Sequence, residues 1–563
     1  MASIVKKIKK GRPYYYAVES ARVGGKPRIV WQKYLGTVDA IVQRAEQARP
    51  AKPKETVIFE AGGVVALLRI AQRLGVTELI NEVVPKREQG PSVGHYMVLA
   101  AINRAMAPSS KLKIGDWYEE TVLRRLWRFE KAVFSSQRFW DHMDMVSEQA
   151  IDLIQDKLAL RIQKEFGIDG QTLLYDTTNF FTFLATTNDR SDLAQRGHSK
   201  AKRHDLRQVG LALLVAGEHQ IPLFHRVYRG NVPDVSLFPK LVKEMIGRYG
   251  KILNSSAEAT LVFDKGNVSD DAMGRIVVGG RHFVAAVTAN RVPHILATPL
   301  DQFEDVSNLP GTKALANQEI FWGKKCLFVT VYTESFFTQQ MHGVTQNMVK
   351  CQKKLLDLEK SLIKWRKGKA RGKKPTARGV KKSVNSILSP QFMKDIFEVK
   401  VEEEKGLPAL RYELNHDALD SLTNERLGRT VLVTDNIDWN TKQVIETYRS
   451  LTQIEEAFKN MKNIDFLHWQ PAYHWTDQKI KVHGFYCVLA LLLSTLARKV
   501  AYQAGIELSL PALLKELSSI REVAVVYPKG TLAHRKDHIT LSRMTPRQRK
   551  LADCLKIGIA LGG

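Results

Sequence analysis

The pattern of apolar and polar positions divides the chain into regions of different periodicity. Near the N-terminus, Y-Y-Y-A-V-E-S and R-I-V-W-Q-K-Y-L-G alternate as strands do, and G-G-K-P between them predicts a turn. Residues 1–47 are therefore expected to form a small basic β-hairpin unit, followed by a Pro- and Lys-containing linker at 48–54. Runs such as G-V-V-A-L-L-R-I-A-Q-R-L-G predict a helical region over 55–168. This region could bind duplex DNA or serve as a structural scaffold.

A strand-rich pattern begins at residue 169. The expected elements are three strands, a helix, a strand, a helix and a strand, at Gln171–Phe183, Gln208–Ala216, Pro222–Gly230, Ser236–Tyr249, Ala259–Lys265, Asp270–Val278 and His282–Thr288. The segment 259–265 is mostly apolar, as expected for a strand covered on both faces. The order β-β-β-α-β-α-β predicts an α/β fold with a ribonuclease-H-like core, once a final helix is added.

The final helix is predicted at Tyr448–Lys462, a stretch without Gly or Pro. Its apolar residues recur at steps of three and four, which is the spacing of one buried helix face: Leu451, Ile454, Phe458 and Met461. At about 100° per residue, Glu455 lies at the edge of that face and Glu456 points towards water. The predicted core therefore has a first part at 169–290 and a last part at 437–505.

Residues 291–436 separate the two parts of this core and carry strand patterns of their own, around 319–332, 410–414 and 430–434. They are expected to form a β-rich insertion, with a helix near 344–367. The segment 364–382 holds ten basic residues and no acidic one. It could contact DNA directly or be a solvated loop. Residues 506–563 are expected to form a basic C-terminal region.

Charge and cysteine content narrow the class of protein. The 563 residues include 85 Lys and Arg against 58 Asp and Glu, a net charge of +27, which predicts a polyanionic partner, although basic charge can also serve solubility alone. Four scattered cysteines indicate neither a disulfide framework nor a zinc site. The uncharged run at 484–497 is too short to span a bilayer of about 30 Å. We therefore expect a cytoplasmic, nucleoid-associated protein without a membrane partner.

Three acidic residues occupy positions at which the predicted elements can meet. Asp176 lies inside the first strand, Asp264 ends the fourth, and Glu455 lies on the final helix. Two-metal phosphoryl transfer needs about three acidic residues converging on a pair of divalent ions, and Mg²⁺ prefers carboxylate oxygen. Taken singly, an Asp that ends a strand is more often a turn or a helix cap. Together with the element order and the charge, the three predict a metal site facing a phosphodiester.

Several sequence motifs together resemble those of a known family. They are Y-D-T-T-N at 175–179, G-H-S-K with H-D-L-R-Q at 197–208, P-L-F-H-R-V-Y-R-G-N-V-P-D at 222–234, V-F-D-K-G-N at 262–267, I-E-E-A-F-K-N-M-K at 454–462 and Y-H-W-T-x3-I-x2-H at 473–483. The chain resembles the insertion-sequence DDE transposases of the branch with a Tyr-x2-Arg-x3-Glu-x6-Lys signature and a β-rich insertion before the catalytic Glu. The resemblance covers about residues 170–500.

The resemblance implies a DNA transposase that cuts at the ends of its insertion sequence and joins the 3′ ends to target DNA. Asp176, Asp264 and Glu455 would be catalytic and would bind two Mg²⁺ ions, which Mn²⁺ could replace. Tyr448 and Lys462 would contact phosphates near the transposon end. The partners would be double-stranded DNA with terminal inverted repeats and target DNA, bound by a homodimer.

Other residues have more than one interpretation. Lys200, Lys202 and Arg203 could bind DNA near the site or belong to a solvated basic loop. His474 and His483 could lie near the acidic cluster or form hydrogen bonds in the core. Three tryptophans could stack on an unpaired base or pack in the core or an interface: Trp439, Trp469 and Trp475.

One position departs from the family signature. The Arg of the signature falls on Leu451, and Lys459 could supply the missing charge to DNA. Two alternatives to a transposase therefore remain. The first is a structure-selective metal-dependent nuclease with the same core, and the second is an inactive DNA-binding transposase relic.

Overall fold

The computed structural model describes residues 2–47, 52–86, 89–168, 170–185, 187–197, 203–252, 259–404, 406–470, 472–528 and 537–558. The chain divides into two compact units. Unit 1 contains Met1–Ile70, Lys111–Ser135 and Val500–Gly563, and unit 2 contains Ala71–Ser110 and Ser136–Lys499. Residues 55–168, predicted as one helical region, are thus shared between the two units.

Unit 1 begins with a three-stranded antiparallel sheet in the order β1-β2-β3. The strands are β1 (Ala2–Lys9), β2 (Arg12–Val23) and β3 (Lys26–Gly36), and α1 (Val38–Gln47) follows them. The two strands predicted from the alternating pattern are β2 and β3. The third strand, β1, was not predicted, because I-V-K-K-I-K-K at 4–10 lacks a regular alternation of apolar and polar residues.

A second sheet of unit 1 joins residues from near both ends of the sequence. Its strands are β4 (Glu55–Glu60), β16 (Arg521–Val526) and β17 (His538–Leu541), in the order β17-β16-β4. The region predicted as helical from residue 55 therefore starts with a strand. This strand was not predicted, because its pairing partner lies more than 450 residues away in the sequence. The helices of this part are α2 (Gly62–Arg73), α5 (Ile114–Glu119), α6 (Leu123–Trp127), α19 (Leu510–Ser518) and α20 (Pro546–Cys554), with a 3-10 turn at Lys131–Phe134.

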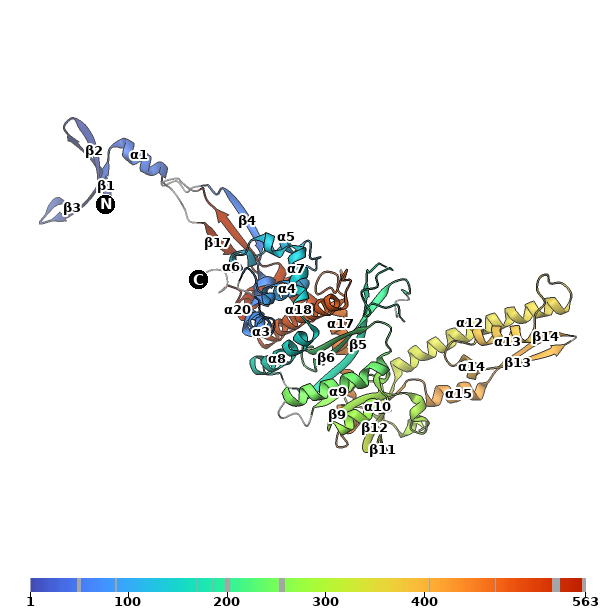
Figure 1. Ribbon diagram of the computed structural model, residues 1–563. Coiled ribbons are helices and arrows are strands. Elements are labelled where there is room, and N and C mark those ends of the chain that lie inside the picture. Colours follow the sequence, from blue (N-terminus) through green and yellow to red (C-terminus); the bar gives the residue numbers. More distant parts are fainter. Residues whose placement is uncertain are drawn as a thin grey trace. The chain divides into compact units, whose positions relative to one another are not determined.

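Unit 2 is a mixed α/β structure built on a nine-stranded sheet (Figure 1). Five of its strands are the predicted ones: β5 (Thr172–Thr182), β6 (Arg207–Ala216), β7 (Pro222–Arg229), β8 (Thr260–Phe263) and β9 (His282–Val287). They lie in the order β7-β6-β5-β8-β9, with β6 antiparallel to both neighbours and β5, β8 and β9 mutually parallel. This mixed sheet is consistent with a ribonuclease-H-like core.

The helices of unit 2 pack against this sheet or against one another. They include α3 (Val76–Val83), α4 (Val93–Met106), α7 (Ser136–Asp144), α8 (Glu148–Phe166), α9 (Asp234–Ile252), α10 (Asp270–Val278), α11 (Pro293–Leu296) and α18 (Asp477–Gln503). A hydrophobic cluster around Phe238, Phe263 and Phe283 fills the core. Helix α18 is long and apolar enough to cross a membrane, but 94% of its most apolar window is buried inside the protein, as in a core helix.

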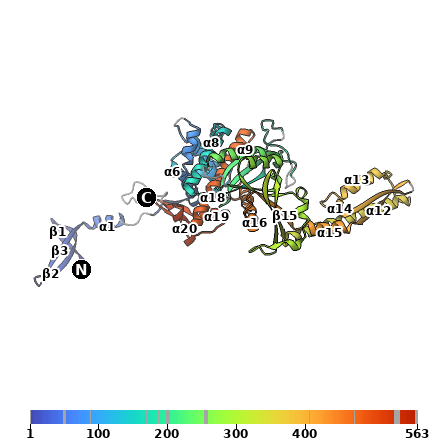
Figure 2. The ribbon, with the colours of Figure 1, turned by 90° about the horizontal axis from the view of Figure 1, so that it is seen from below.

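Part of the insertion extends the core sheet, while β13 (Phe397–Glu404) and β14 (Leu407–Leu414) form a separate two-stranded sheet. Strands β10 (Glu304–Asp305), β11 (Thr312–Phe321), β12 (Lys324–Thr333) and β15 (Arg429–Thr434) continue the sheet beyond β9. Between β12 and β15 lie α12 (Glu334–Arg366), α13 (Ala377–Ile387), α14 (Met393–Ile396), β13, β14 and α15 (His416–Glu425). We call these elements the arm (residues 334–428; Figures 1 and 2). They share a hydrophobic cluster of their own that includes Leu355 and Met393.

The predicted helix Tyr448–Lys462 is in fact two helices, α16 (Thr441–Arg449) and α17 (Thr452–Met461). At the junction, Leu451 N donates to Tyr448 O and Ile454 N to Leu451 O, bonds that span three residues instead of four. The Ser450 hydroxyl also donates to Thr447 O at 2.6 Å. A side chain that bonds to the backbone in this way competes with the regular helix. The prediction of one continuous helix was therefore wrong at Ser450 and Leu451.

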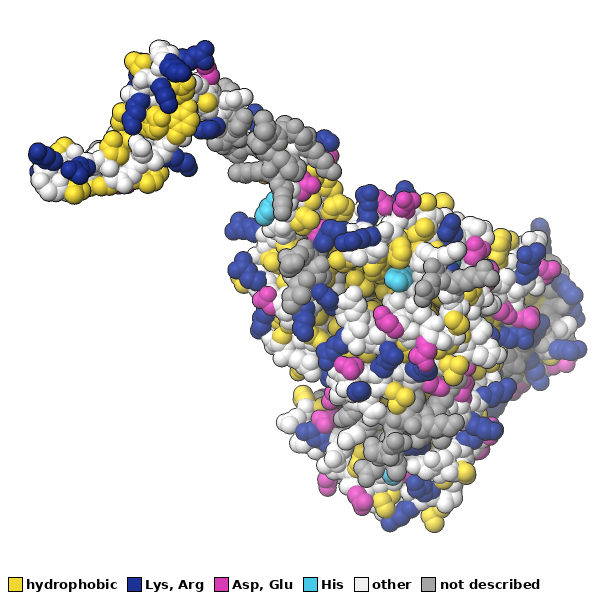
Figure 3. All heavy atoms as spheres, turned by 60° about the vertical axis from the view of Figure 1, so that its left-hand side comes forward, with side chains coloured by type: hydrophobic (Ala, Val, Ile, Leu, Met, Phe, Trp, Pro, Cys, Tyr) yellow, Lys and Arg dark blue, Asp and Glu magenta, His cyan; other side chains and the backbone are white. Residues whose placement is uncertain are grey.

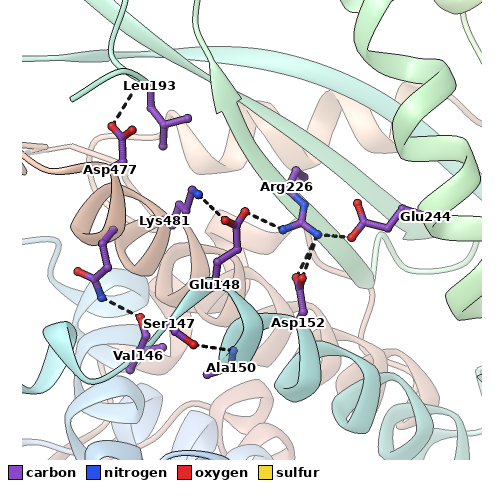
Figure 4. A network of polar contacts seen from close by, with 11 residues as sticks. Val146, Ser147, Glu148, Ala150, Asp152, Leu193, Arg226, Glu244, Asp477 and Lys481 are labelled. Carbon is purple, nitrogen blue, oxygen red and sulfur yellow. Dashed lines mark hydrogen bonds and ion pairs between the residues drawn. The ribbon is translucent and has the colours of Figure 1, made fainter.

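A network of ion pairs connects β7 with the helices that cover it (Figure 4). Arg226 of β7 lies 3.0 Å from Glu148 and 3.1 Å from Asp152 of α8, and also pairs with Glu244 of α9. Lys481 of α18 contacts Glu148 in turn. Burial alone would raise the pKa of Glu148, but the hydrogen bonds and charges of Lys481 and Arg226 outweigh burial and lower it. These ion pairs connect strand β7 with helices α8, α9 and α18.

Candidate active site

Asp176 lies in the middle of β5, the central strand of the five-stranded part β7-β6-β5-β8-β9 of the sheet. Strand β5 pairs with β8 in parallel through Thr172–Thr260, Leu173–Leu261 and Leu174–Val262. Two further residues along the same register bring Asp176 level with Asp264. Because neighbouring strands lie about 4.8 Å apart, the two carboxylates are close across the end of β8.

Asp264 is positioned by the end of its strand. Strand β8 stops at Phe263, all four of its residues are buried, and Asp264 follows in extended conformation with its side chain exposed. Asn267 N donates to Asp264 O at 2.9 Å, which closes the 3-10 turn Lys265–Asn267. A buried apolar strand followed by a tight turn thus leaves this carboxylate at the surface.

Helices α16 and α17 bring two further residues to the same place. Tyr448 lies in the last turn of α16, and Glu455 lies in the first turn of α17 with an exposed side chain. The Tyr448 hydroxyl donates to Asp264 Oδ1 at 2.8 Å. Burial, followed by the negative charge of Asp264 and the hydrogen bond to it, raises the pKa of the Tyr448 phenol.

The charges of Glu455 and Asp176 contribute to the same rise in the pKa of Tyr448. All three predicted carboxylates therefore act on one phenol, although they come from the middle of β5, the end of β8 and the start of α17. A tyrosine phenol is already protonated at neutral pH, and the raised pKa of Tyr448 extends this to more alkaline pH, so that the hydroxyl remains a hydrogen-bond donor.

Lys462 directly follows α17, and its side chain contacts β5, the strand that carries Asp176. Its Nζ donates to Thr178 Oγ1 at 2.8 Å and lies 5.3 Å from the centroid of the Phe180 ring. Residues 176, 178 and 180 share one face of β5 because successive side chains alternate across a strand. Thr178 and Phe180 were not predicted as site residues. Their spacing of two and four from Asp176 would have placed them on the same face of the strand.

The donor atoms around Tyr448 fit a hard divalent cation in type. They are carboxylate oxygens, without thiolate or imidazole, which is the chemistry that Mg²⁺ prefers. Within the ranges that the structure describes, no group of three or more His, Cys, Asp or Glu is arranged to hold a metal ion. In magnesium sites, waters and substrate phosphates usually supply several of the ligands, so that protein carboxylates need to supply only part of the coordination sphere.

The other predicted DNA-binding residues have varied surroundings. Lys459 is exposed on α17. Arg203 pairs with Asp205 at 2.7 Å, and this hydrogen bond lowers the pKa of Asp205 to about 2. Lys200 and Lys202 lie outside the described residues.

The two histidines belong to a buried hydrogen-bonded group. His474 Nε2 lies 2.9 Å from His483 Nδ1, and His483 Nε2 lies 2.7 Å from Trp469 O. Both side chains are buried, which agrees with a structural role in the core. Trp469 is 1% exposed and stacks on Phe180 at 4.4 Å between centroids, so it is a core residue and not a surface for bases. Trp475 is 54% exposed.

Arg104 of α4 fixes the segment after α17 and was not predicted. Its guanidinium donates to His468 O at 3.0 Å and to Gln470 O at 2.7 Å, and the residue is 1% exposed. The backbone that carries Trp469 is thereby held in place. No local sequence pattern marks this residue, because its acceptors lie more than 360 residues along the chain.

Several chains of solved structures match this chain. A cryo-EM structure of the piggyBac transposase synaptic complex with hairpin DNA is similar to this chain with a TM-score of 0.34 and 11% sequence identity, over 80% of this chain and 79% of that chain. At this TM-score the similarity establishes neither the fold nor the function of this chain. A scan against protein-family models gives no match, and a search of curated proteins gives none either.

Proposed function

We propose that this protein is a DNA transposase of the DDE type, which cuts DNA at the ends of its insertion sequence and joins the 3′ ends to target DNA. One observation carries the proposal: Asp176, Asp264 and Glu455 all act on the phenol of Tyr448. The strand order β7-β6-β5-β8-β9 and the net charge of +27 support it, because they fit a ribonuclease-H-like core with a polyanionic partner.

The three carboxylates would hold two Mg²⁺ ions, which Mn²⁺ could replace. When bound, such ions activate the attacking oxygen and stabilise the leaving oxygen of an in-line displacement at phosphorus. The protonated Tyr448 hydroxyl orients Asp264 and can donate to a phosphate oxygen. Lys462 presents an ammonium group along the same strand face, above Phe180, where it can bind the next phosphate.

The chemistry consists of two displacements at one site. In the first, a water oxygen attacks phosphorus at the transposon end, the bond from phosphorus to the 3′ oxygen breaks, and the water loses a proton. The freed 3′ hydroxyl then attacks a phosphodiester of the target, losing its proton and displacing a 3′ oxygen of the target strand. Two ends must be brought together, so we propose a homodimer on DNA, in the nucleoid.

Cleavage and strand transfer on duplexes carrying the ends of the element test the proposal. Asp176→Asn, Asp264→Asn and Glu455→Gln proteins should each lose activity at least about a thousandfold, since several kcal/mol of charge stabilisation are removed. The matched control is Glu456→Gln, one residue along the same helix, where the carboxylate accepts from Gln220 at 2.7 Å. Full cleavage by the three variants would overturn the proposal.

The products separate this proposal from its two rivals. A nuclease with the same site would cut the ends without joining them to target DNA, and a relic would bind them without magnesium-dependent nicking. The relic is motivated by Leu451, which stands where the signature has Arg and which here lies at the start of α17. Joined products from the wild-type protein would exclude both.

A further inference from the structure

The N-terminal sheet exposes an unusual amount of apolar surface. In β1–β3 only Val18 and Gly36 are buried. Nine large hydrophobic side chains of residues 2–47 are exposed: Ile4, Ile8, Val23, Ile29, Val30, Trp31, Tyr34, Val38 and Val42. Figure 3 shows hydrophobic side chains mixed with Lys and Arg on the surface of this sheet. Exposed apolar surface on this scale is typical of a region that binds a partner.

Part of this sheet is a two-stranded ribbon. Strand β1 pairs with β2 only from Arg12 to Glu19, so Ser20–Val23 and Lys26–Ile29 continue without a third strand. Gly24 and Gly25 connect them with φ values of 60° and 79°, the left-handed conformations of a two-residue hairpin turn. Residues 20–29 form what we call the ribbon.

The charge of the sheet selects its partner. Residues 2–36 contain nine Lys and Arg and a single acidic residue, Glu19. In the ribbon, Arg22, Lys26 and Arg28 are all exposed. The pairing of Ala21 with Arg28 and of Val23 with Lys26 places Lys26 and Arg28 on one face, and Arg22 lies on the other. A polyanion complements this surface.

The width of the ribbon indicates duplex DNA as the polyanion. Two paired strands lie about 4.8 Å apart, and the major groove of B-form DNA is about 12 Å wide, which admits a two-stranded ribbon. We propose that residues 20–29 enter the major groove of duplex DNA, with Lys26 and Arg28 facing base edges and Arg22 facing a phosphate. Arginine and lysine donate to the acceptors of guanine in this groove. The assignment rests on the proposed function only in taking DNA as the partner.

Binding of the full-length protein to short duplexes tests the assignment, measured by fluorescence anisotropy at several salt concentrations with a chelator present. The ribbon variant is Arg22→Ala/Lys26→Ala/Arg28→Ala. The matched control, Lys9→Ala/Lys10→Ala/Arg12→Ala, removes three charges from the opposite end of the same sheet. We expect the ribbon variant to bind at least tenfold more weakly and to lose about two to three units of salt slope. The control should remain within about threefold of the wild type.

The groove is tested on the wild-type protein. Methylation of guanine N7 should weaken binding, because that atom lies in the major groove, whereas netropsin, which occupies the minor groove, should compete little. Arg22→Lys/Arg28→Lys keeps the charge and should retain the salt slope while losing preference for the element ends over random duplexes. This variant also covers the case in which the alanine protein misfolds.

Three results would overturn the assignment: equal losses by the two alanine variants, no loss by the ribbon variant, or single strands bound as tightly as duplexes. Its failure is distinguishable from failure of the proposed function. If the wild type nicks DNA with magnesium and the ribbon variant binds normally, the ribbon assignment fails and the transposase stands. If binding depends on the ribbon but the wild type does not nick DNA with magnesium, the ribbon assignment stands and the transposase proposal fails.

Discussion

Two sheets of this chain differ sharply in how they use hydrophobic side chains. In the nine-stranded sheet, all residues of β8 and all but the first residue of β6 are buried. In the N-terminal sheet, β3 has ten residues that are exposed or half-buried, and large hydrophobic side chains such as Trp31 face solvent. The nine-stranded sheet is stabilised by its own core. The N-terminal sheet has little core and offers its surface to a partner.

This difference explains where each kind of function can lie. A rigid core sheet can hold carboxylates from distant segments at fixed positions, as it does for Asp176 and Asp264. A thinly packed, basic sheet can adapt to a ligand and gains stability when it binds. Substitutions should therefore change the free energy of unfolding strongly in the nine-stranded sheet and only slightly in the N-terminal sheet.

The largest expected effect is in the core sheet. Phe263 is fully buried, and its ring lies 4.8 Å from that of Phe238. Phe263→Ala should lower the free energy of unfolding by about 3–5 kcal/mol, because it leaves a cavity. Chemical denaturation followed by circular dichroism measures this. Phe263→Leu is the control, with a loss below about 1.5 kcal/mol, and equal losses would contradict the packing argument.

A smaller effect is expected where the core sheet meets its helices. Arg226→Leu leaves Glu148, Asp152 and Glu244 without their shared cation, and the Arg226 side chain is only 16% exposed. We expect a loss of about 3 kcal/mol in thermal or chemical unfolding. The control is Arg229→Leu, whose side chain is 52% exposed and lies 4.0 Å from Asp192, with a loss below about 1 kcal/mol. Comparable losses would show that the network does not couple the elements.

The pH dependence of stability should also come from the core sheet. Burial, and then the charge of Arg226, lowers the pKa of His225 from 6.5 to about 3. Between these values the unfolded chain binds a proton that the folded chain does not, so stability falls as the pH falls. The loss should reach about 2 kcal/mol at pH 5. His225→Gln should remove this part of the pH dependence, and identical pH profiles for the two proteins would refute it.

The smallest effect on stability is expected in the N-terminal sheet. Trp31 is 49% exposed on β3. Trp31→Ala should change the free energy of unfolding by less than about 0.5 kcal/mol, since little surface becomes exposed. Hydrogen exchange in β2 and β3 reports this sheet directly, and unchanged protection is expected. A marked loss of protection would mean that the sheet has a core after all and would remove the contrast.

The sequence predicted the core elements well because their burial leaves a local signal. Strand β8 was predicted at Ala259–Lys265 and spans Thr260–Phe263, and α10 was predicted at its observed bounds. The element order then identified Asp176, Asp264 and Glu455 as residues that could meet. Their placement around Tyr448 follows that order, and their catalytic role remains a prediction.

Other features depend on contacts that no local pattern reveals. The break between α16 and α17 was missed because the apolar residues on either side keep one helical phase, while the Ser450 hydroxyl bonds to the backbone. In the insertion, the predicted strand patterns cover parts of β11, β12, β14 and β15, but β10 and β13 were missed. Pairing such as that of Val431 with Val287 joins residues about 140 apart. Arg104 was missed for the same reason.

The arm begins and ends at one place in the sheet. Strands β12 and β15 are antiparallel neighbours, Tyr332 is paired with Arg429, and Thr333 N donates to Gly428 O at 3.0 Å. A two-residue hairpin turn could therefore replace residues 334–427 without altering the register of either strand. The segment behaves as a cassette, which evolution could insert, exchange or delete at a single junction, and which an engineer could transplant into another antiparallel hairpin.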